Sequence, residues 1–327
     1  MTYIKMFDED IYKLVNKESK EALEDYILEL KSKGRAEKTI AQYVFDIKAF
    51  LCYVYENEDN KSILDLRRRD FRTFFLYMKE TCKSSARINR FMSSIRNWCL
   101  YLEEDEDDYE HYENSPMRKI RSVESESVRE IFFLTDEQVE FLVDYLVKNN
   151  QLQKALYVEL SYSSGARRGE IIQVTKQPFL EDGNMTGVVT GKRGKQFKLV
   201  FSNRCKKIAQ MYLKQRGDDN IDSLWVTGKG ENKRELGYDS LYNFAVSFRK
   251  ILQEEYNENI ELNSHTFRHS FAQNLSDSTH YMLKELGKEK LTLNEIRILM
   301  NHNSVDITQS YMKNEDEEFL KNLFSTE

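Results

Sequence analysis

The chain contains only 2 prolines and 12 glycines among its 327 residues. Both residues interrupt helices, because proline lacks an amide hydrogen and glycine loses the most backbone entropy on folding. Their scarcity over this length favours a mostly helical protein. Apolar residues make up 40% of the chain and charged residues 32%, which is enough for buried cores beneath a charged surface. The length favours about two domains of roughly 150 residues each.

The first third of the sequence predicts a compact helical unit at residues 20–106, after an N-terminal leader at 1–19. Apolar residues recur there at helical spacing. The four expected helices are 20–35, 39–55, 64–79 and 84–102. The run 103–113 then holds 8 carboxylates, and Pro116 cannot continue a helix. We therefore predict an interdomain linker at residues 107–130.

Residues 131–327 predict a second domain with one small β-sheet. Thr135 and Gln138 have the spacing of a capping box, so a helix begins there. Alternating apolar residues predict strands at 185–190 and 197–201, joined by a turn at 192–195. The other helices are expected at 153–163, 168–174, 240–256, 264–275, 292–300 and after Tyr311. The fold class is therefore mainly α with a small β-sheet.

The charge distribution bears on a nucleic-acid partner. A net charge of −6 and a pI of about 5.7 count against one. Residues 31–102, however, contain 15 basic and 8 acidic residues, and residues 190–207 contain 7 basic residues and no acidic one. These faces suit phosphate contacts, although solvated helix faces explain them equally well. The candidate DNA contacts are Lys38, Thr39, Lys83, Ser84, Arg87, Arg90, Arg96, Arg193 and Lys195.

Cysteine usage and hydropathy predict a cytoplasmic protein without a membrane segment. The four cysteines show no C-x-x-C spacing and no matched histidines, so we expect them to be reduced and mostly buried. Residues 1–20 are polar and mixed in charge, unlike a signal peptide. No apolar run approaches the roughly 20 residues of a membrane span.

The last third of the chain carries a group suited to phosphodiester chemistry. His265, Arg268 and His269 share one face of the expected helix. A guanidinium donates in pairs to phosphate oxygens. The phenol of Tyr311 is a nucleophile once a proton acceptor or an electropositive pocket activates it, and His302 lies nine residues before it. Taken singly, a surface His–Arg cluster and a packing tyrosine are the alternatives.

Two further candidates lie upstream. Arg167 follows Gly165 at the end of an apolar helix, and Glu170 is placed to pair with it and fix its rotamer. Lys192 lies in the expected turn between the two strands. Without the other residues, a surface or helix-capping arginine and a solvent-exposed hairpin lysine would be the simpler interpretations.

Together these residues resemble the tyrosine recombinase (phage integrase) family in order and spacing. Gly165 to Glu170 match its Gly-x-Arg-x-x-Glu-like stretch, and Gly191-Lys192 match its hairpin lysine. His265 to His269 match its His-x-x-Arg-His box. Asn301-His302, followed by Tyr311, match its Gly-His-like motif and its nucleophile. The resemblance spans roughly residues 20–327 and identifies 20–106 with the family's core-binding (SAM-like) domain.

The chain also departs from the family pattern. Asn301 stands where glycine is common, and Phe267 where leucine is common. The stretch from Arg268 to His302 is longer than in compact members, so residues 276–290 are expected to form an extra loop or helix. Lys195 shares the hairpin with Lys192, which makes the assignment of the lysine less specific.

The resemblance implies DNA strand cleavage and rejoining without metal or nucleotide cofactor. Tyr311 would attack the scissile phosphate, form a 3′-phosphotyrosyl bond and leave a free 5′-hydroxyl. The other catalytic residues it assigns are Arg167 and Arg268 on the non-bridging oxygens, Lys192 on the 5′-oxygen, His265 on the phenol's proton and His302 on the phosphate. Glu170 would support Arg167, and His269 would support the helix that carries Arg268.

The implied partners are double-stranded DNA with short inverted half-sites and three further copies of the chain. A C-terminal tail with the apolar stripe Phe319, Leu320, Leu323 and Phe324 would dock on a neighbour or pack on its own domain. The short leader favours a recombinase without an arm-site-binding domain, acting at the prokaryotic nucleoid in dimer resolution or mobile-element integration and excision. A catalytically inactive or relaxation-only DNA-binding relative and a plain helical interaction protein are the alternatives.

Overall fold

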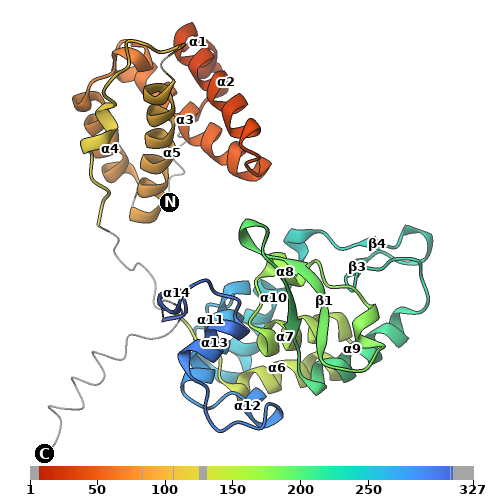
Figure 1. Cartoon of the computed structure of the whole chain (residues 1–327). Coiled ribbons are helices and arrows are strands. Elements are labelled where there is room, and N and C mark those ends of the chain that lie inside the picture. The colour runs from red at the N-terminus through yellow and green to blue at the C-terminus, as the bar shows by residue number, and fades with distance from the viewer. Residues whose placement is uncertain (1–6, 83, 106, 125–130, 310, 312–327) are drawn as a thin grey trace, which may run out of the picture. The chain divides into compact units, whose positions relative to one another are not determined.

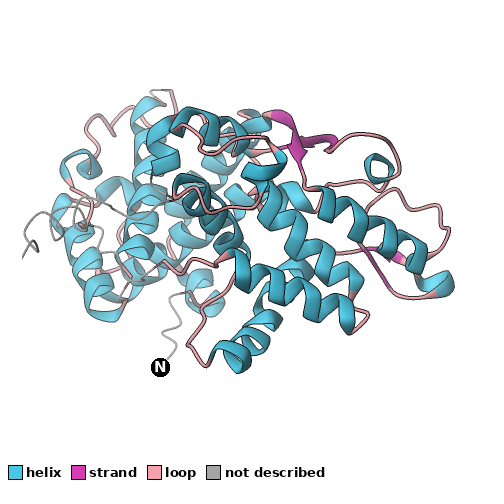
Figure 2. Ribbon diagram, turned by 90° about the horizontal axis from the view of Figure 1, so that it is seen from below, coloured by secondary structure: helices cyan, strands magenta, loops and turns pink. Residues whose placement is uncertain are grey.

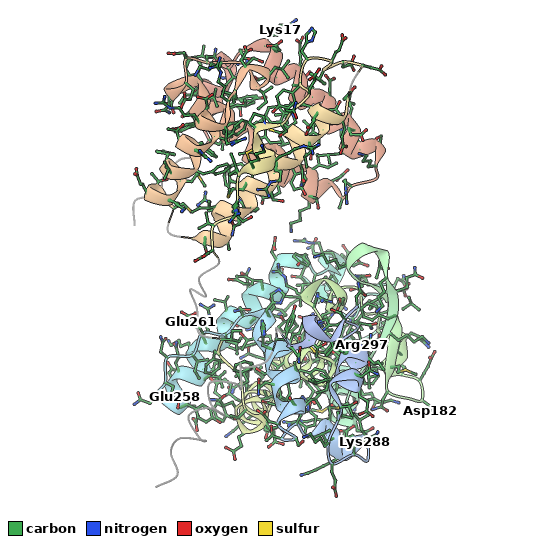
Figure 3. All side chains as sticks on the ribbon, turned by 60° about the vertical axis from the view of Figure 1, so that its left-hand side comes forward. Lys17, Asp182, Glu258, Glu261, Lys288 and Arg297 are labelled. Atoms are coloured by element: carbon green, nitrogen blue, oxygen red, sulfur yellow. The ribbon has the colours of Figure 1, made fainter. Side chains whose placement is uncertain are left out.

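The computed structural model describes residues 7–82, 84–105, 107–124, 131–309 and 311. The chain divides into two compact units, Met1–Arg129 and Glu130–Glu327. Helices dominate, and the strands of the described residues all lie in the second unit (Figures 1 and 2). Charged side chains such as Lys17, Asp182 and Lys288 lie at the surface of their own units (Figure 3). Among the described helices, none is long and apolar enough to cross a membrane.

The first unit is a bundle of helices around an aromatic core. Its helices are α1 (Glu9–Leu14), α2 (Lys17–Ser32), α3 (Glu37–Asn57), α4 (Arg68–Thr81) and α5 (Ser85–Glu104). Phe50 stacks on Phe71 and meets Phe74 edge to face. Trp98 is fully buried and its indole donates to the carbonyl of Ala22 at 3.1 Å, which joins α5 to α2. The four predicted helices are confirmed with small shifts of their ends.

The predicted leader at 1–19 is wrong from Glu9 onward, because these residues belong to the bundle. Asp8 caps α1 by accepting from two backbone amides. Asn16 caps α2 and its own amide donates to Asn60 at 2.9 Å. Ser19 is buried and accepts from the amide of Ile63. Helix α1 is only six residues long, too short for periodicity to reveal it, and α2 begins three residues before its predicted start.

The predicted linker at 107–130 is also folded onto the first unit over most of its described part. The Tyr109 hydroxyl donates to Asp25 at 2.6 Å, and Met117 is fully buried. Asn89 on α5 both accepts from the amide of Val123 and donates to its carbonyl. The acidic run thus ends a helix without ending the unit, because aromatic and aliphatic residues after it return to the core.

The second unit is built around the buried helix α7 (Leu152–Ser164). The other helices are α6 (Asp136–Lys148), α8 (Arg168–Ile171), α9 (Asn203–Arg216), α10 (Tyr238–Tyr256), α11 (Ser264–Ser276), α12 (Met282–Glu285), α13 (Leu293–Leu299) and α14 (Val305–Gln309). Helices α6, α9 and α11 pack directly on α7. The sequence did not predict α9, yet its buried face, including Ile208 and Tyr212, closes the core.

The predicted hairpin is present as the antiparallel strands β1 (Met185–Thr190) and β2 (Gln196–Val200). Thr190 pairs with Gln196, and a 3₁₀ turn at Lys192–Gly194 joins the strands. A second pair, β3 (Val226–Thr227) with β4 (Arg234–Glu235), was not predicted because each strand has only two residues. The first hairpin brings its lysines toward the mouth of the candidate site.

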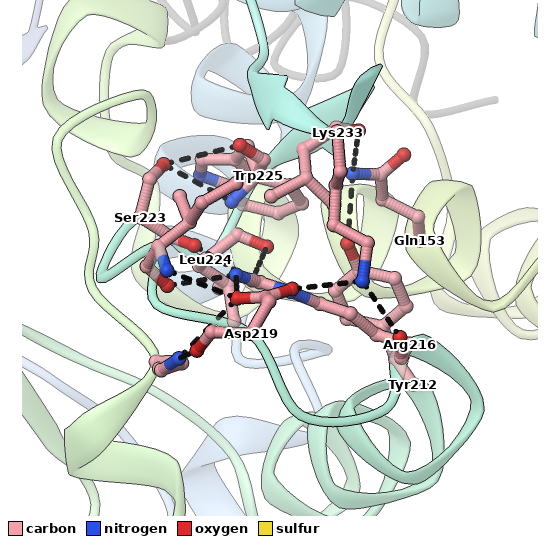
Figure 4. Close-up of polar contacts among 11 residues, drawn as sticks. Gln153, Tyr212, Arg216, Asp219, Ser223, Leu224, Trp225 and Lys233 are labelled. Carbon is pink, nitrogen blue, oxygen red and sulfur yellow. Dashed lines mark hydrogen bonds and ion pairs between the residues drawn. The ribbon is translucent and has the colours of Figure 1, made fainter. Parts of the chain in front are cut away.

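A polar cluster fixes the long connection between α9 and α10 (Figure 4). Arg216 donates to Asp219 and to the backbone carbonyls of Ile221, Ser223 and Leu224. Lys233 donates to the same aspartate at 3.0 Å. These hydrogen bonds, chiefly those from Arg216, hold the pKa of Asp219 well below its usual range. The chain entering α10 is therefore firmly anchored.

Residues 276–290, predicted as an extra loop or helix, contain α12 and are tied to the core by two aromatic residues. The ring of His280 stacks on Tyr162 at 4.3 Å. The Tyr281 hydroxyl donates to the buried carboxyl of Glu159 at 2.6 Å. Burial raises the pKa of Glu159. The segment is thus an integral part of the second unit.

Candidate active site

Gly165 positions the first catalytic candidate. It ends α7 in the left-handed conformation, with φ +58°, and a β-carbon there would overlap the ring of Phe271 on α11. Only glycine satisfies both constraints. The turn that it makes brings Arg167 out of the core, at the N-cap of α8.

Glu170 holds Arg167 in place. Its Oε2 accepts from the Arg167 amide at 2.7 Å, and its Oε1 accepts from Nη1 at 3.0 Å. The Glu170 side chain is 3% exposed and that of Arg167 is 28% exposed. The buried carboxylate thus fixes the base of the guanidinium while its outer edge faces a cavity. A β-carbon on Gly191 would lie 3.3 Å from Glu170, so the hairpin packs closely here.

Arg268 is almost fully buried at the centre of the site. Its Nη1 donates to the carbonyl of Gly165 at 2.5 Å and its Nη2 to the carbonyl of Met300 at 2.8 Å. Its Nε has no partner within the described residues. An unsatisfied buried donor is costly, and Arg268 itself lines neither of the cavities described below. Burial and the neighbouring Arg167 lower the pKa of Arg268 to about 10, which keeps it charged at neutral pH.

His302 faces Arg268. The Arg268 Nη2 donates to its Nε2 at 2.5 Å, and its Nδ1 lies 2.9 Å from the Thr308 hydroxyl. Because arginine only donates, Nε2 accepts and the ring proton sits on Nδ1. Burial and the charges of Arg268, Arg167 and Lys195 lower the pKa of His302 to about 3. The imidazole is therefore neutral, and its Nε2 is occupied by the Arg268 guanidinium. The hydrogen bond from His302 to phosphate that the resemblance implies requires His302 to give up one of its present partners.

Tyr311 lies against two histidines and an arginine. Its ring stacks on His269 with centroids 4.5 Å apart and lies 5.0 Å from the ring of His302. The Arg268 Cζ lies 5.3 Å from its centroid. His269 Nδ1 also donates to the Tyr311 carbonyl at 3.2 Å. His269 therefore orients the tyrosine directly, beyond the helix support that the sequence suggested.

Asn301 explains one departure from the family pattern. It adopts φ +56°, in the left-handed region where glycine is preferred and asparagine is tolerated. The backbone turn before His302 is therefore kept without glycine. Arg297 Nη1 donates to the His302 carbonyl at 3.1 Å and secures the same turn.

Two adjoining cavities meet at Arg167 and Lys192, which line both. The Tyr311 cavity, of about 270 Å³, also holds Lys195 and His302. The Tyr238 cavity, of about 330 Å³, also holds Tyr238, Tyr242 and His265.

The two predicted residues His265 and Tyr311 line different cavities. His265 lines the Tyr238 cavity and does not line the Tyr311 cavity. Burial and the charges of Arg268, Arg167 and Arg168 lower the pKa of His265, which favours its neutral form. Both hairpin lysines are exposed: Lys195 Nζ donates to the Asn301 carbonyl at 3.5 Å, and Lys192 lines both cavities.

The predicted DNA contacts of the first unit fall into two groups. Lys38 and Thr39 are exposed at the start of α3, and Ser84 is exposed as the cap of α5, next to Arg87. The recorded partners of Arg90 and Arg96 lie inside the unit: Arg90 forms a two-point ion pair with the buried Asp46, and Arg96 donates to the Ile120 carbonyl. We therefore do not propose Arg90 and Arg96 as DNA contacts. Lys83 and the side chain of Arg193 lie outside the described residues.

Sequence reasoning missed several residues at the site. Thr308 and Arg297 hold His302, and Tyr238 and Tyr242 line the second cavity. The two tyrosines lie four residues apart at the start of α10, a spacing that puts them on one helix face. Within the described residues, no group of His, Cys, Asp or Glu side chains is placed to hold a metal ion.

Comparisons with known proteins agree with this architecture. The tyrosine recombinase XerD of Oceanobacillus iheyensis is 24% identical over 89% of this chain and 92% of its own length. XerC of Treponema denticola is 25% identical over 88% and 92%. XerH recombinase bound to palindromic difH in a post-cleavage complex shares the fold, with TM-score 0.65 and 16% identity over 93% of this chain and 83% of that one. A lambda integrase tetramer bound to a Holliday junction gives TM-score 0.65 and 15% identity over 90% and 77%.

Family models account for both units. The N-terminal SAM-like domain of phage integrases matches residues 23–105. The phage integrase family model matches residues 133–318, more than half of the chain, including every catalytic candidate from Arg167 to Tyr311. This protein belongs to the phage integrase family.

Proposed function

We propose that this protein is a site-specific DNA recombinase that cleaves and rejoins strands through a 3′-phosphotyrosyl intermediate. The observation that carries the proposal is the convergence of Tyr311, Arg167 and Lys192 on one cavity, with Arg268 behind the phenol. Similarity to Xer recombinases over nearly their whole length supports it.

The reaction follows from the charges around the cavity. The Tyr311 oxygen forms a bond to phosphorus as the bond to the 5′-oxygen breaks, and Lys192 gives that oxygen a proton. Arg167 and the unsatisfied Nε of Arg268 stabilise the negative charge that builds on the non-bridging oxygens. Each preorganised donor of this kind contributes roughly 3–4 kcal/mol. The bond energy is kept in the phosphotyrosyl link, so the reverse attack by a 5′-hydroxyl rejoins the strand.

Two roles are open to His265. Its neutral imidazole can take the phenol's proton, which requires substrate to bring the two side chains together. Its place beside Lys192 in the Tyr238 cavity suits action at the leaving oxygen instead, and the phenol's proton then passes to solvent water. Proton transfer by a positioned side chain contributes about 100- to 10,000-fold in rate, so removal of His265 has a measurable effect in either role.

The partners that we propose for this chain, DNA and further copies of itself, are those present in the comparison structures. One is a recombinase on a palindromic site and another is a tetramer on a Holliday junction. We propose a duplex with short inverted half-sites and a tetramer assembled on two such duplexes at the prokaryotic nucleoid. The tail stripe Phe319, Leu320, Leu323 and Phe324, proposed to join neighbours, lies outside the described residues. Dimer resolution and mobile-element integration or excision both fit this activity.

The first test removes the nucleophile. Tyr311→Phe, used to select duplexes from a random-sequence library, should bind its site but form no covalent protein–DNA adduct on a denaturing gel. Tyr145→Phe, an exposed tyrosine of α6, is the matched control and should form the adduct. An adduct persisting in Tyr311→Phe would refute the proposal. Supercoiled plasmid with and without the selected site separates recombination from relaxation alone.

The second test locates the proton donor to the leaving oxygen. Replacing the bridging 5′-oxygen of the selected duplex by sulfur removes the need for that proton, because a thiolate leaves unaided. Lys192→Ala should therefore cleave the sulfur duplex at close to the wild-type rate and the oxygen duplex at least about 100-fold more slowly. If the sulfur duplex restores the cleavage rate of His265→Gln, His265 acts at the leaving oxygen. If the cleavage rate stays low on the sulfur duplex, His265 acts at the phenol. A Lys192→Ala enzyme equally slow on both duplexes would contradict the lysine assignment.

A further inference from the structure

Two tyrosines at the start of α10 line the Tyr238 cavity. Tyr238 is 39% exposed and Tyr242 is 42% exposed, and they lie one helical turn apart. The cavity that they share with Arg167, Lys192 and His265 has a volume of about 330 Å³, within the range of roughly 300–1,000 Å³ typical of small-ligand sites. The catalytic roles assigned above leave both aromatic rings without a function.

The rings are held by Arg168, which lines the same cavity. The Arg168 guanidinium lies 3.8 Å from the centroid of Tyr238 and 5.4 Å from that of Tyr242. Arg168 also pairs with Asp239 at 3.6 Å, and α8 packs on α10. The amide of Leu236 donates to the Trp225 carbonyl, and the Asp219 cluster anchors the preceding loop (Figure 4). The tyrosines therefore form a fixed platform, which loses little entropy on binding.

The platform and the nucleophile line separate cavities that share the catalytic cations. Tyr311 lines one cavity, the two tyrosines line the other, and Arg167 and Lys192 line both. In an in-line displacement the nucleophile and the leaving oxygen lie on opposite sides of phosphorus. A phosphate held between Arg167 and Lys192 and attacked from the Tyr311 cavity thus directs its leaving oxygen toward the Tyr238 cavity.

We propose that the Tyr238 cavity binds the deoxynucleotide whose 5′-oxygen is released, by stacking its unpaired base on Tyr238 and Tyr242. This inference rests on the proposed recombinase function. Cleavage breaks the covalent link of this strand to the phosphate, and stacking keeps its 5′-hydroxyl near Lys192 for rejoining. Aromatic rings suit the task at any sequence, because every base presents a π-face.

The test places 2-aminopurine, whose fluorescence is quenched when stacked, at this nucleotide of the selected duplex. A bridging 5′-sulfur traps the cleaved state. We expect low fluorescence in the wild-type adduct and a several-fold rise in Tyr238→Ala/Tyr242→Ala. With an oxygen duplex, the rejoining rate of this double variant should fall about 10-fold, within the energy of base–aromatic stacking. Tyr238→Phe/Tyr242→Phe should keep both properties, and Tyr145→Ala is the matched exposed control.

The outcomes separate this inference from the proposed function. An unchanged fluorescence and rejoining rate in the double alanine variant, with adduct formation intact, would overturn the platform alone. An equal loss of affinity for the uncleaved duplex would also overturn it, since the tyrosines would then contact intact DNA. A wild-type protein that forms no adduct would refute the recombinase function and this inference together.

Discussion

His280 makes the second unit sensitive to acid, and the size of the effect follows from its surroundings. The ring is 1% exposed and stacks on Tyr162. Its Nε2 donates to the Tyr162 carbonyl at 3.3 Å and its Nδ1 accepts from the Met282 amide at 3.1 Å, so both nitrogens are occupied in the neutral form. Burial lowers its pKa from 6.5 to about 3.

The sign of the pH dependence follows from this difference. Below pH 6.5 His280 is protonated in the unfolded chain, whereas in the folded protein it stays neutral down to about pH 3. The contribution of His280 to the free energy of unfolding is therefore at its maximum above pH 6.5 and falls as the pH drops. At pH 5 the loss attributable to His280 is about 2 kcal/mol. His280→Phe keeps a stacking ring without a titrating group. Its free energy of unfolding should therefore decline less between pH 7 and pH 5, by about 2 kcal/mol.

The assay is urea unfolding at a series of pH values, followed by the fluorescence of Trp225. Trp98→Phe is used as the background, so that the signal comes from the second unit. The slope of the unfolding free energy against pH is compared between the variant and its background. Loss of the His280 hydrogen bonds lowers the free energy by the same amount at every pH and so does not change this slope. His111→Gln, an exposed histidine of the first unit, is the control and should leave the slope unchanged. An unchanged slope in both His280→Phe and His280→Gln would refute the reasoning.

Two other substitutions test the structural roles assigned above. Gly165→Ala should destabilise the second unit by about 2 kcal/mol or more, because alanine is strained in the left-handed conformation and its β-carbon overlaps Phe271. Its adduct formation should also fall, because Arg167 shifts. Unfolding and cleavage like those of the wild type would contradict this. Arg90→Ala should lower the stability of the first unit by about 2 kcal/mol, because the buried carboxylate of Asp46 keeps its donors Gln42 and Ser94 but loses its charged partner. Urea unfolding measures it, and unchanged stability with weakened duplex binding would return Arg90 to the DNA contacts.

Much of the fold was predictable because it depends on local patterns. Long helices such as α3 and α5 bury several turns of apolar residues, and these repeats stand out in the sequence. The β1–β2 hairpin was predicted from alternating residues around a glycine-containing turn. Helix α9 and the capped helix α1 were missed, the first for its basic exposed face and the second for its shortness.

The candidate site was predictable in its residues but less so in their partners. The resemblance to tyrosine recombinases, carried by the order and spacing of the motifs, selected Arg167, Arg268 and Tyr311. It did not show that His269 stacks on Tyr311, nor that Arg90 pairs with Asp46. Such partners lie tens of residues apart in the chain, so only packing decides them.

The sequence by itself determined a helical protein of two units and a set of residues suited to phosphodiester chemistry. Residue type and short-range spacing carry that information. Only the tertiary structure decided which groups share a cavity. It set Tyr311 and the Tyr238–Tyr242 pair in separate cavities that have Arg167 and Lys192 in common. That arrangement depends on how α8, α10, α11 and the hairpin pack on α7. It therefore results from the sum of long-range contacts and is not encoded in any one motif.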